Sequence, residues 1–584
     1  MGVGPQSTFA DQLHAEKYRQ KGEDFRGAMN RVAFAMADGH DHYHDFREVL
    51  LDMRFMPGGR IQAAMGAAKK VTPYNCFVAS KIDDSFVEGD NSIMGVATQA
   101  AQTMRMGGGI GYDFSTLRPS GALIKKLGSR SSGPMAFMNI FNEVCKATSS
   151  AGNRRGAQMG VLRVDHPDIV AFVHAKNNLD KLNGFNISVA VTDEFMEAVD
   201  KQSSFELKFG GRVYDEIDAL ELYEMMMRST WDWAEPGILF IDTINRMNNL
   251  WYCEEIAATN PCGEQPLAPN AACLLGSFNL VRYIRKDKQT GLYYFDFDQL
   301  KADIPHVVRA MNMVIDRAIY PLQAQMDAAH AKRRMGLGVT GVANAIETLG
   351  FPYGTPDYIA MQGTILKVIE HGAYMASIDL AKEKGPFPLF DAEKYLAGEY
   401  IKTLPEDVRA GIAKHGILNS HLLSIAPTGT ISQTADNVSS SIEPVFEEVT
   451  QRPVFMAEGK IIVSEPDYAF AQFGTKPKIS DHVSLDEHLG VLLNATKHVD
   501  SAVSKTCNTA GDFTPWDDFK ALYRRAWEGG AKGVTTFNKD GKRLALLTKG
   551  TIKSVAKVEE EVDQTEKQVE ACEFDAATGR RSCE

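Results

Sequence analysis

Apolar runs of strand length alternate with helical stretches from about residue 90 onward. Asn186-Ile-Ser-Val-Ala-Val191 and Gly237-Ile-Leu-Phe-Ile241 are examples of such runs. Strands that alternate with helices are joined by crossover connections and form a parallel sheet covered by helices. The pattern therefore predicts an α/β fold. Residues 8–55 carry helical periodicity, which predicts a short helical segment before the sheet begins.

The composition narrows the class of protein. The 584 residues are 44% hydrophobic and 24% charged, as in ordinary globular proteins. No apolar run reaches the roughly 18 residues of a membrane-spanning helix, and the first residues lack the basic and apolar regions of a signal peptide. The net charge of −12 argues against binding polymeric nucleic acid. Eight cysteines are too few for a disulfide scaffold in so long a chain, so we expect a cytoplasmic protein with no membrane contact.

The segment Asn260-Pro-Cys-Gly-Glu264 can present three chemical groups to one small volume. In an extended segment, side chains alternate faces with a period of two, so that Asn260, Cys262 and Glu264 would point the same way. An amide and a carboxylate can hold neighbouring hydroxyls of a sugar, and a thiol between them is placed to react. A surface turn around a buried cysteine is the alternative, because Asn-Pro and Cys-Gly are ordinary turn dipeptides.

A second segment, Ser424-Ile-Ala-Pro-Thr-Gly-Thr-Ile-Ser432, is an apolar run that ends in a turn of small residues with hydroxyl groups. Such turns offer backbone N–H groups and hydroxyls to a phosphate, often at a helix N-terminus. A sugar-binding segment and a phosphate-binding turn together suggest a nucleotide substrate. Taken alone, the second segment could also be a plain turn between a strand and a helix.

These segments belong to a larger set of motifs that resembles the signature set of the ribonucleotide reductase catalytic subunit. The order of the motifs along the chain also matches, and the similarity covers roughly residues 8–548. The motifs are Met56-Pro-Gly-Gly-Arg60, Tyr74-Asn-Cys76, Gly107-Gly-Gly-Ile-Gly111, Asn260-Pro-Cys-Gly-Glu264, Cys273-Leu-Leu-Gly-Ser-Phe-Asn279 and Pro427-Thr-Gly-Thr-Ile431.

The resemblance implies a particular α/β architecture. The family fold is a ten-stranded α/β barrel of two five-stranded half-barrels, with the loop that carries Cys262 threaded through its centre as a finger loop. Residues 1–55 would then be an N-terminal helical segment, residues 56–548 the catalytic barrel, and residues 549–584 a flexible C-terminal tail.

The resemblance also assigns roles to individual residues. Cys262 corresponds to the cysteine whose thiyl radical removes the 3′ hydrogen of the ribose. Glu264 corresponds to the general base at the 3′ hydroxyl, and Asn260 to the amide that binds the sugar hydroxyls. Cys76 and Cys273 correspond to the pair that protonates the leaving 2′ hydroxyl, supplies two electrons and ends as a disulfide. The implied substrate-binding residues are Asn75, Pro427, Thr428, Gly429, Thr430 and Ile431.

The source of the radical separates three classes of this family. The oxygen-dependent class receives it from a second subunit through two adjacent tyrosines, but Thr535 and Thr536 stand at these positions. The anaerobic class needs a glycyl radical motif, which residues 578–583 do not resemble. Ser504-Lys-Thr506 and residues 533–543 fit the remaining class, which uses adenosylcobalamin and reduces ribonucleotides to deoxyribonucleotides. The alternative is a class I large subunit fed by a metal-containing partner.

Cys572 and Cys583 follow an acidic stretch that is typical of a mobile linker. In the family such a tail reduces the active-site disulfide by thiol exchange, so a thioredoxin-like or other thiol reductant is an expected partner. Ten residues separate these two cysteines, whereas the family usually has two. Incidental cysteines in a disordered tail are therefore the alternative. Cys145, Cys253 and Cys507 are expected to be small buried hydrophobic residues.

Regulation by a deoxynucleoside triphosphate bound near the interface of a homodimer is a further implication of the resemblance. Asp84 corresponds to the acidic residue at the effector ribose, and Arg118 and Arg130 are candidate phosphate ligands. Asn178-Leu-Asp-Lys-Leu-Asn183 corresponds to a loop between effector and substrate. About 50 residues precede the first motif, about half of what the ATP-cone of the family needs, so overall control by dATP is not expected. The expected substrate is a diphosphate.

Two other patterns were weighed against this interpretation. Gly336-Leu-Gly-Val-Thr-Gly341 matches a dinucleotide-binding fingerprint, but the Ala-rich, charged stretch before it predicts a helix instead of the required strand. A dehydrogenase would also leave the cysteine motifs unexplained. His40, His42 and His44 could suggest a metal site, yet alternating histidines on a solvated turn are the preferred interpretation, and no metal site is expected. A protein that kept the fold and lost catalysis remains an alternative, although every expected catalytic residue is present.

Overall fold

The structure is a computed structural model. It describes residues 3–125, 127–149, 157–177, 181–456, 459–509, 514–538, 541–542, 548–549, 573–575 and 580–582. Most of the expected C-terminal tail, with Cys572 and Cys583, lies outside the described residues, as do residues 178–180 of the expected loop between effector and substrate.

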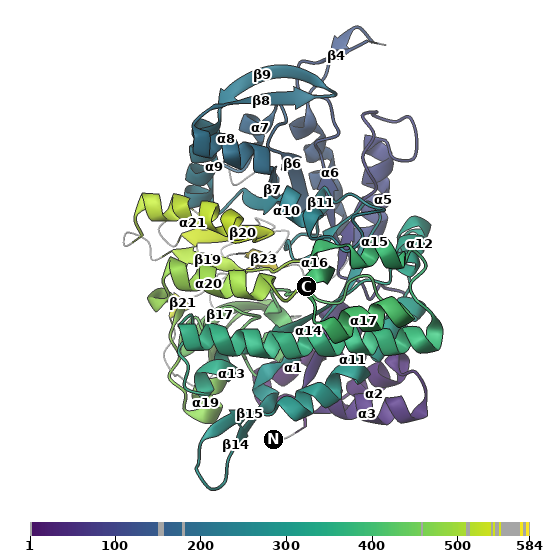
Figure 1. Ribbon diagram of the computed structural model, residues 1–584, viewed down its shortest axis with the longest axis vertical. Coiled ribbons are helices and arrows are strands. Elements are labelled where there is room, and N and C mark those ends of the chain that lie inside the picture. The colour runs from purple at the N-terminus through teal and green to yellow at the C-terminus, as the bar shows by residue number, and fades with distance from the viewer. Residues whose placement is uncertain are drawn as a thin grey trace.

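Ten strands of the described residues form one sheet in the centre of the molecule (Figure 1). The strand order is β1-β13-β2-β3-β6-β7-β10-β20-β19, and β16 pairs with β13. The strands are β1 (Phe55–Pro57), β2 (Cys76–Val78), β3 (Gly109–Asp113), β6 (Gln158–Arg163), β7 (Phe185–Val191), β10 (Gly237–Phe240), β13 (Ala272–Asn279), β16 (Met335–Thr340), β19 (Thr506–Thr509) and β20 (Gly533–Asn538).

The sheet contains both parallel and antiparallel pairs. β2, β3, β6, β7 and β10 are parallel neighbours, and so are β13 with β16 and β19 with β20. Antiparallel pairing joins β10 to β20, β2 to β13 and β1 to β13. Parallel bridges also join Leu337 to Leu423 and Ile425 to Val503, which lies just before β19. The α/β fold predicted from alternating strands and helices is confirmed.

Helices and small hairpins surround the sheet. The helices are α1 (Thr8–Tyr18), α2 (Phe25–Met36), α3 (His40–Leu51), α4 (Gly59–Ala64), α5 (Ile93–Arg105), α6 (Pro134–Ser149), α7 (Ile169–Val173), α8 (Asp193–Lys201), α9 (Ala219–Trp233), α10 (Ile241–Arg246), α11 (Phe297–Arg317), α12 (Gln323–Lys332), α13 (Val342–Thr348), α14 (Pro356–Lys384), α15 (Ala392–Leu396), α16 (Glu399–Thr403), α17 (Glu406–His415), α18 (Gly429–Thr434), α19 (Tyr468–Phe473), α20 (Leu485–Thr496) and α21 (Trp516–Glu528), with 3-10 turns η1 (Leu280–Tyr283) and η2 (Ser480–His482). The paired outer strands are β4 (Leu123–Ile124) with β5 (Ser129–Arg130), β8 (Ser204–Phe209) with β9 (Arg212–Asp218), β14 (Ile284–Lys286) with β15 (Tyr293–Phe295), β17 (Val449–Met456) with β18 (Gly459–Pro466) and β21 (Thr548–Lys549), and β22 (Glu573–Asp575) with β23 (Arg580–Ser582).

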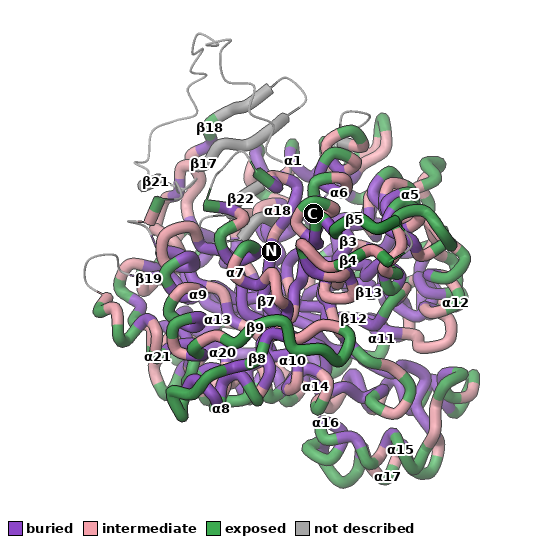
Figure 2. The backbone as a smooth tube through the Cα atoms, turned by 90° about the horizontal axis from the view of Figure 1, so that it is seen from above, coloured by how far each residue is buried: buried purple, intermediate pink, exposed green. Residues whose placement is uncertain are grey.

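The N-terminal helices α1 to α3 lie where the periodicity predicts helices. Side-chain caps start two of them: Ser7 accepts a hydrogen bond from the backbone N–H of Ala10, and Asp24 accepts one from Gly27. The buried apolar side chains of α2 and α3, and Tyr18 at the end of α1, join the main core. Phe9 and Leu13 of α1 form a small separate cluster with Val463. Figure 2 shows this buried interior in the middle of the molecule, with α15 to α17 and the β8–β9 hairpin at its exposed margin. None of the described helices combines the length and apolar character that a membrane crossing requires.

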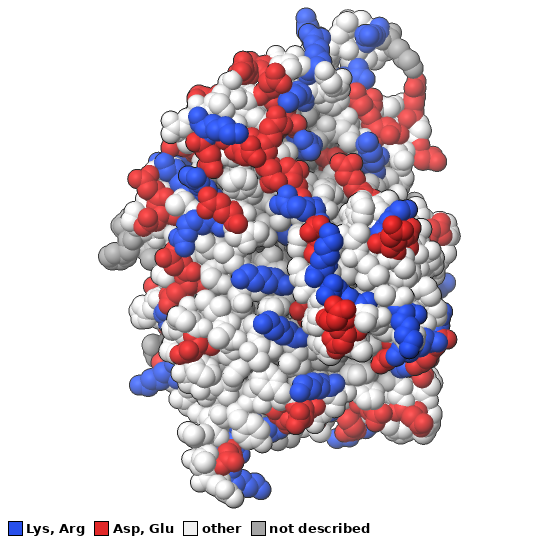
Figure 3. All heavy atoms as spheres, in the orientation of Figure 1, with Lys and Arg blue, Asp and Glu red and all other residues white. Residues whose placement is uncertain are grey.

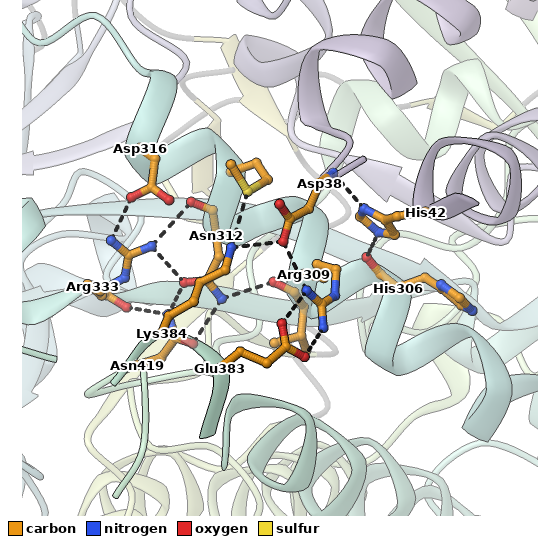
Figure 4. Close-up of polar contacts among 12 residues, drawn as sticks. Asp38, His42, His306, Arg309, Asn312, Asp316, Arg333, Glu383, Lys384 and Asn419 are labelled. Atoms are coloured by element: carbon orange, nitrogen blue, oxygen red, sulfur yellow. Dashed lines mark hydrogen bonds and ion pairs between the residues drawn. The ribbon is translucent and has the colours of Figure 1, made fainter. Parts of the chain in front are cut away.

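A network of charged side chains ties the long helix α14 to α11 and to the segment before α3 (Figure 4). Arg309 on α11 forms an ion pair with Glu383 on α14 and lies 2.9 Å from Asp38. The ammonium of Lys384 lies 2.8 Å from the same Asp38 oxygen. These hydrogen bonds, that of Lys384 first, lower the pKa of Asp38 despite its partial burial. The N-terminal helices are thereby fixed against α14.

The three alternating histidines lie on helix α3 and not on a solvated turn, which corrects the sequence-based interpretation. His42 is 8% exposed. It accepts a hydrogen bond from the backbone of Asp38 and lies 2.9 Å from the carbonyl oxygen of His306. Burial lowers the pKa of His42, which favours this neutral state. In the described ranges, no group of three or more His, Cys, Asp or Glu side chains is arranged to hold a metal ion.

The glycine-rich motif begins in strand β16, which follows helix α12, and its last residue, Gly341, precedes helix α13. In a dinucleotide-binding fold the strand comes before the motif and the glycines form the turn into the helix, whereas here Gly336 and Gly338 lie within the strand. A Cβ atom on Gly338 would lie 2.4 Å from the carbonyl oxygen of Ser424. The glycine is therefore needed because another backbone segment packs directly against the strand.

Candidate functional site

The Asn260–Glu264 segment forms the tip of a short hairpin between β11 (Ala258–Thr259) and β12 (Pro266–Leu267). The amide oxygen of Asn260 accepts a hydrogen bond from the backbone N–H of Gln265 at 2.9 Å, and their backbones also pair. Gly263 has a φ of +81°, which suits glycine. The expected extended conformation is therefore wrong, because Asn260 closes a tight turn. This turn is buried, with Asn260 at 2% and Glu264 at 1% exposure, so that it is not the surface turn of the alternative interpretation either.

One cavity nevertheless brings together most of the residues that the sequence predicted. The predicted residues that line it are Asn75, Cys76, Asn260, Cys262, Glu264, Pro427, Thr428 and Ile431. The amide oxygen of Asn75 is buried and has no hydrogen-bond partner among the described residues, which is typical of a group that meets a ligand. Gly429 and Thr430 belong to the first turn of α18 and are not part of this lining.

Cys76 and Cys273 face each other across neighbouring antiparallel strands. They are directly paired in the β2–β13 ladder, and residues opposed in this way have Cα atoms close enough for a disulfide. Both thiols are free in the structure, and both belong to an apolar cluster inside the sheet. The two cysteines, 197 positions apart by their numbers (273 − 76), are thus neighbours in space, as the resemblance required.

Burial controls the protonation of this cysteine pair. Burial raises the pKa of Cys76 well above its ordinary range, and the nearby Glu264 and Cys273 raise it further. Burial also raises the pKa of Cys273, although Arg334 opposes the shift. Both groups are therefore held as neutral thiols, which can give up protons.

Glu264 is held by contacts at both its backbone and its side chain. Its carbonyl oxygen accepts hydrogen bonds from the hydroxyl of Ser424 at 2.9 Å and from the backbone N–H of Ala502 at 3.0 Å. The thiol of Cys76 lies 3.7 Å from the carboxylate, and the amide of Asn260 donates to the same sulfur at 3.1 Å. The carboxylate is consequently placed beside the cysteine pair and is 1% exposed as a residue.

The predicted phosphate-binding turn connects an apolar segment to the short helix α18. Thr428 adopts a left-handed conformation with a φ of +57°. Its hydroxyl accepts a hydrogen bond from the backbone of Ser441 at 2.7 Å and lies 3.0 Å from the hydroxyl of Thr340. The Thr428 side chain therefore shapes the turn, while its cavity-facing atoms lie next to Pro427 and Ile431.

A second cavity lies against the hairpin tip and was not predicted. Pro261, Cys262 and Gly263 line it together with residues of β7, β10 and β20. Asn186 on β7 donates a hydrogen bond to the Pro261 carbonyl at 2.9 Å and so holds the tip in place. Cys262 lines both this cavity and the first. The hairpin therefore presents one thiol to two separate spaces.

The two threonines at the expected tyrosine positions lie on β20. Thr535 lines the second cavity, whereas Thr536 is fully buried and lies 2.7 Å from the hydroxyl of Tyr523. Among the described residues that line the two cavities there is no tyrosine or tryptophan. A side chain able to carry a radical into the site is thus missing from this lining.

The predicted effector residues lie away from both cavities. Arg118 donates to the carboxylate of Asp84 from its guanidinium at 2.6 Å and from its backbone at 3.2 Å. Arg130 is exposed on β5 and donates to the carbonyl of Gly121. Two of the three residues are therefore brought together, and Arg118 is engaged with Asp84.

The remaining cysteines divide into two kinds. Cys145 and Cys507 are buried, as expected, but Cys253 is exposed. The expectation fails for Cys253 because it lies in the turn after α10, next to the charged Glu254 that pairs with Lys332 and Arg334.

Comparison with known proteins points to one family. The family model described as ribonucleotide reductase, barrel domain, matches residues 74–472. The vitamin B12-dependent ribonucleoside-diphosphate reductase of Mycobacterium tuberculosis (strain CDC 1551 / Oshkosh) is 32% identical over 575 residues, covering 92% of this chain and 79% of the relative. The protein of the same name from Thermoplasma acidophilum is 32% identical, and the match covers 89% of this chain and 68% of the relative. A vitamin B12-dependent ribonucleotide reductase of Streptomyces coelicolor is 26% identical, and the match covers 93% of this chain and 64% of the relative.

Proposed function

Because the chain belongs to the ribonucleotide reductase family, we propose that it reduces ribonucleoside diphosphates to 2′-deoxyribonucleotides by a thiyl-radical mechanism that adenosylcobalamin initiates. One observation carries the proposal: Cys262 lines two cavities, one of which also contains Asn260, Glu264 and Cys76. A thiol that takes up a radical on one side and acts on a substrate on the other must face both. The names of the relatives, vitamin B12-dependent and ribonucleoside-diphosphate reductase, support the cofactor and the diphosphate.

The fold that we propose is the ten-stranded barrel of two five-stranded half-barrels. Its support is the run of parallel strands β2, β3, β6, β7 and β10, and the Leu337–Leu423 and Ile425–Val503 bridges that continue from β16 towards β19. The β11–β12 hairpin is then the central finger loop. The segments 1–55, 56–548 and 549–584 follow as the N-terminal helical segment, the catalytic barrel and the flexible tail.

The first cavity binds the ribose, and its side chains divide the chemistry. Cys262 removes the hydrogen atom from C3′, Glu264 takes the proton of the 3′ hydroxyl, and Asn260 binds the sugar hydroxyls. Support comes from the shared cavity and from the fixed position of Glu264, whose carbonyl is held by Ser424 and Ala502. The Pro427–Ile431 turn and Asn75 hold the remainder of the nucleotide.

The cysteine pair completes the reduction. Cys76 and Cys273 together give up two protons and two electrons: one proton joins the leaving 2′ hydroxyl, which departs as water, the second hydrogen is delivered to C2′, and the two thiols become one disulfide. Their raised pKa values support this role because a protonated thiol can donate a proton. Each turnover consumes the thiol pair, so a thioredoxin-like or other thiol reductant must restore it, directly or through Cys572 and Cys583. Free thiols also support a cytoplasmic location.

The second cavity is the candidate site for the radical-generating end of the cofactor, because the Cys262 thiol lines it on the side away from Glu264 and Cys76. Gly237, Gly263 and Gly533 contribute no side chain to this lining. Adenosylcobalamin, when bound, supplies a carbon-centred radical that can take a hydrogen atom from a thiol. Asn186, Ser188, Glu235 and Thr535 are the polar side chains of this lining that would be available to it. The alternative is a radical-generating partner subunit, which would need tyrosines on β20 to pass the radical. Thr535 and Thr536 stand at these positions and do not support it.

The regulatory assignments are also proposals. The Asp84–Arg118 pair and Arg130 are the effector site that we propose for a deoxynucleoside triphosphate. A homodimer interface next to it is supported by exposed apolar side chains in the loop between Asp84 and α5, where Phe86 is 52% and Val87 is 65% exposed.

An anaerobic assay tests the proposed function. The purified chain would be given CDP, a mixture of deoxynucleoside triphosphates and dithiothreitol, with or without adenosylcobalamin. We expect deoxycytidine diphosphate only with the cofactor, none with Cys262→Ala, and nearly full activity with the matched control Cys253→Ala, because Cys253 is exposed and outside both cavities. Product formed without the cofactor would contradict the proposal. Product formed from CTP but not from CDP would contradict the assignment of a diphosphate substrate.

A further inference from the structure

A separate pocket of about 860 Å³ opens between α11, α14, α16, α17 and the end of α20. None of its lining residues borders the two cavities around Cys262. Its volume falls within the range of about 300–1,000 Å³ that is typical of ligand sites. Its titratable lining residues are Lys301, Lys367, Lys497, His371, His498 and Glu370. The pocket is therefore a ligand-sized space with an unusual share of basic groups.

The lysines of this pocket are unusual because their charges are hardly balanced. Lys367 and Lys497 have no acidic partner within 4.0 Å among the described residues, and Lys301 reaches only Asp298 at 3.8 Å. Elsewhere on α14, Lys382 pairs closely with Asp379 at 2.7 Å. Figure 3 shows this face of the molecule, where single basic side chains over α14 are separated by uncharged atoms. Lysine ammonium groups without a nearby carboxylate favour the binding of an anion.

Glu370 in the pocket lining and Asp407, which contacts the lining residue His371, are both hydrogen-bonded to groups other than the lysines. Glu370 accepts a hydrogen bond from the hydroxyl of Tyr400 at 2.6 Å, and the imidazole of His498 lies 3.2 Å from its other oxygen. Asp407 lies 2.7 Å from the imidazole of His371. Each of these two carboxylates is thus hydrogen-bonded to a histidine, and among the described residues neither lies within 4.0 Å of a pocket lysine. The lysine charges then remain available to a ligand.

The shape and the chemistry of the lining identify the class of ligand. We propose that this pocket binds an oligophosphate, that is, a chain of linked phosphates, either free or carried by a nucleoside. Three ammonium groups from three different elements, at Lys301, Lys367 and Lys497, suit several negative charges spread along a chain better than one small anion. No Phe, Tyr or Trp lines the pocket in the described part of the chain, so a stacked base contributes little.

The floor of the pocket is organised before any ligand arrives. Lys367 and His371 lie one turn apart on the same face of α14. His498 is 8% exposed and is held by the buried Glu370. Two residues further, both carboxylate oxygens of Asp500 accept backbone hydrogen bonds, from Leu422 and Leu423. A rigid floor lowers the entropic cost of binding, because only the lysine side chains must be ordered.

Calorimetric titration of the full chain with inorganic tripolyphosphate tests the proposal. We expect binding that weakens by about tenfold or more in the double variant Lys367→Ala/Lys497→Ala. The matched control is Lys382→Ala/Lys402→Ala, which removes two exposed lysines of α14 and α16 outside the pocket. This control should bind like the unchanged chain. Neither pair of lysines belongs to the proposed catalytic or effector residues.

Titration with ATP separates the two sources of the phosphate chain. If the nucleotide is the source, the pocket variant also loses affinity for ATP; if a free oligophosphate is the source, only the tripolyphosphate titration changes. An Arg118→Ala variant removes the proposed effector site and should leave tripolyphosphate binding to the pocket intact. Binding that is absent, or that is equal in the pocket variant and the control variant, would overturn the proposal, whatever the outcome of the reductase assay.

Discussion

The hydroxyl of Ser424 is predicted to position the catalytic hairpin without touching the substrate. It donates to the carbonyl oxygen of Glu264 at 2.9 Å, and the residue is fully buried. Ser424→Ala removes this hydrogen bond and leaves the carbonyl with its second donor, Ala502. Because the carbonyl keeps one partner, we expect the free energy of unfolding to fall by about 1 kcal/mol. The activity should fall further than this suggests, since the Glu264 turn loses one of its two anchors.

Chemical denaturation and steady-state kinetics on the same preparations test this prediction. The matched control is Ser377→Ala on α14. It removes an equally buried hydroxyl, which donates a hydrogen bond to the side-chain oxygen of Asn419 at 2.8 Å. Both variants should lose similar stability, but only Ser424→Ala should lose kcat, by roughly tenfold if about 1.4 kcal/mol of positioning is lost. Equal kcat values in the two variants would refute the argument that this hydroxyl holds the active hairpin.

Three further predictions concern the cysteine pair and the strand behind it. Cys76→Ser should lower dithiothreitol-supported turnover by at least about a hundredfold, because the serine hydroxyl cannot form the disulfide; retained multiple turnover would contradict this. At pH 8, iodoacetamide should alkylate Cys76 and Cys273 much more slowly in the folded chain than in the unfolded chain, as followed by mass spectrometry. The reason is that burial raises the pKa of both thiols and so lowers the fraction present as reactive thiolate. Gly338→Ala should destabilise the chain by about 1–3 kcal/mol in thermal unfolding, because its Cβ would lie 2.4 Å from the Ser424 carbonyl; an unchanged Tm would contradict the close packing.

Sequence reasoning identified the chemistry of the site better than its local geometry. The residue types and their spacing were enough to group Asn260, Cys262 and Glu264, and one cavity does contain all three. The extended conformation was wrong because the Asn260 amide bonds to the Gln265 backbone and closes a turn. Both conformations are compatible with the Pro and Gly between these residues, so that local sequence could not decide between them.

Other features depended on contacts that no single segment encodes. The second cavity combines Asn186 and Thr535 from β7 and β20 with the hairpin tip. Residues 533–543 indicate the cofactor class, but the local sequence does not show that β7 and β20 meet at the hairpin. His42 was taken as solvated because its neighbours are polar, but it packs against the carbonyl of His306 on another helix. Cys253 is expected to be buried as a small hydrophobic residue, yet it lies exposed in its turn. Such placements follow from tertiary packing.

Release of tritium tests the central claim, that Cys262 connects the two cavities, most directly. The chain would be incubated anaerobically with adenosylcobalamin tritiated at the 5′ carbon and with a deoxynucleoside triphosphate, and tritium in the water would be counted. The unchanged chain and Cys273→Ser should both release tritium, because the exchange needs only the thiol that faces the cofactor cavity. Cys262→Ala should release none. Equal release from Cys262→Ala, or none from the unchanged chain, would contradict the account.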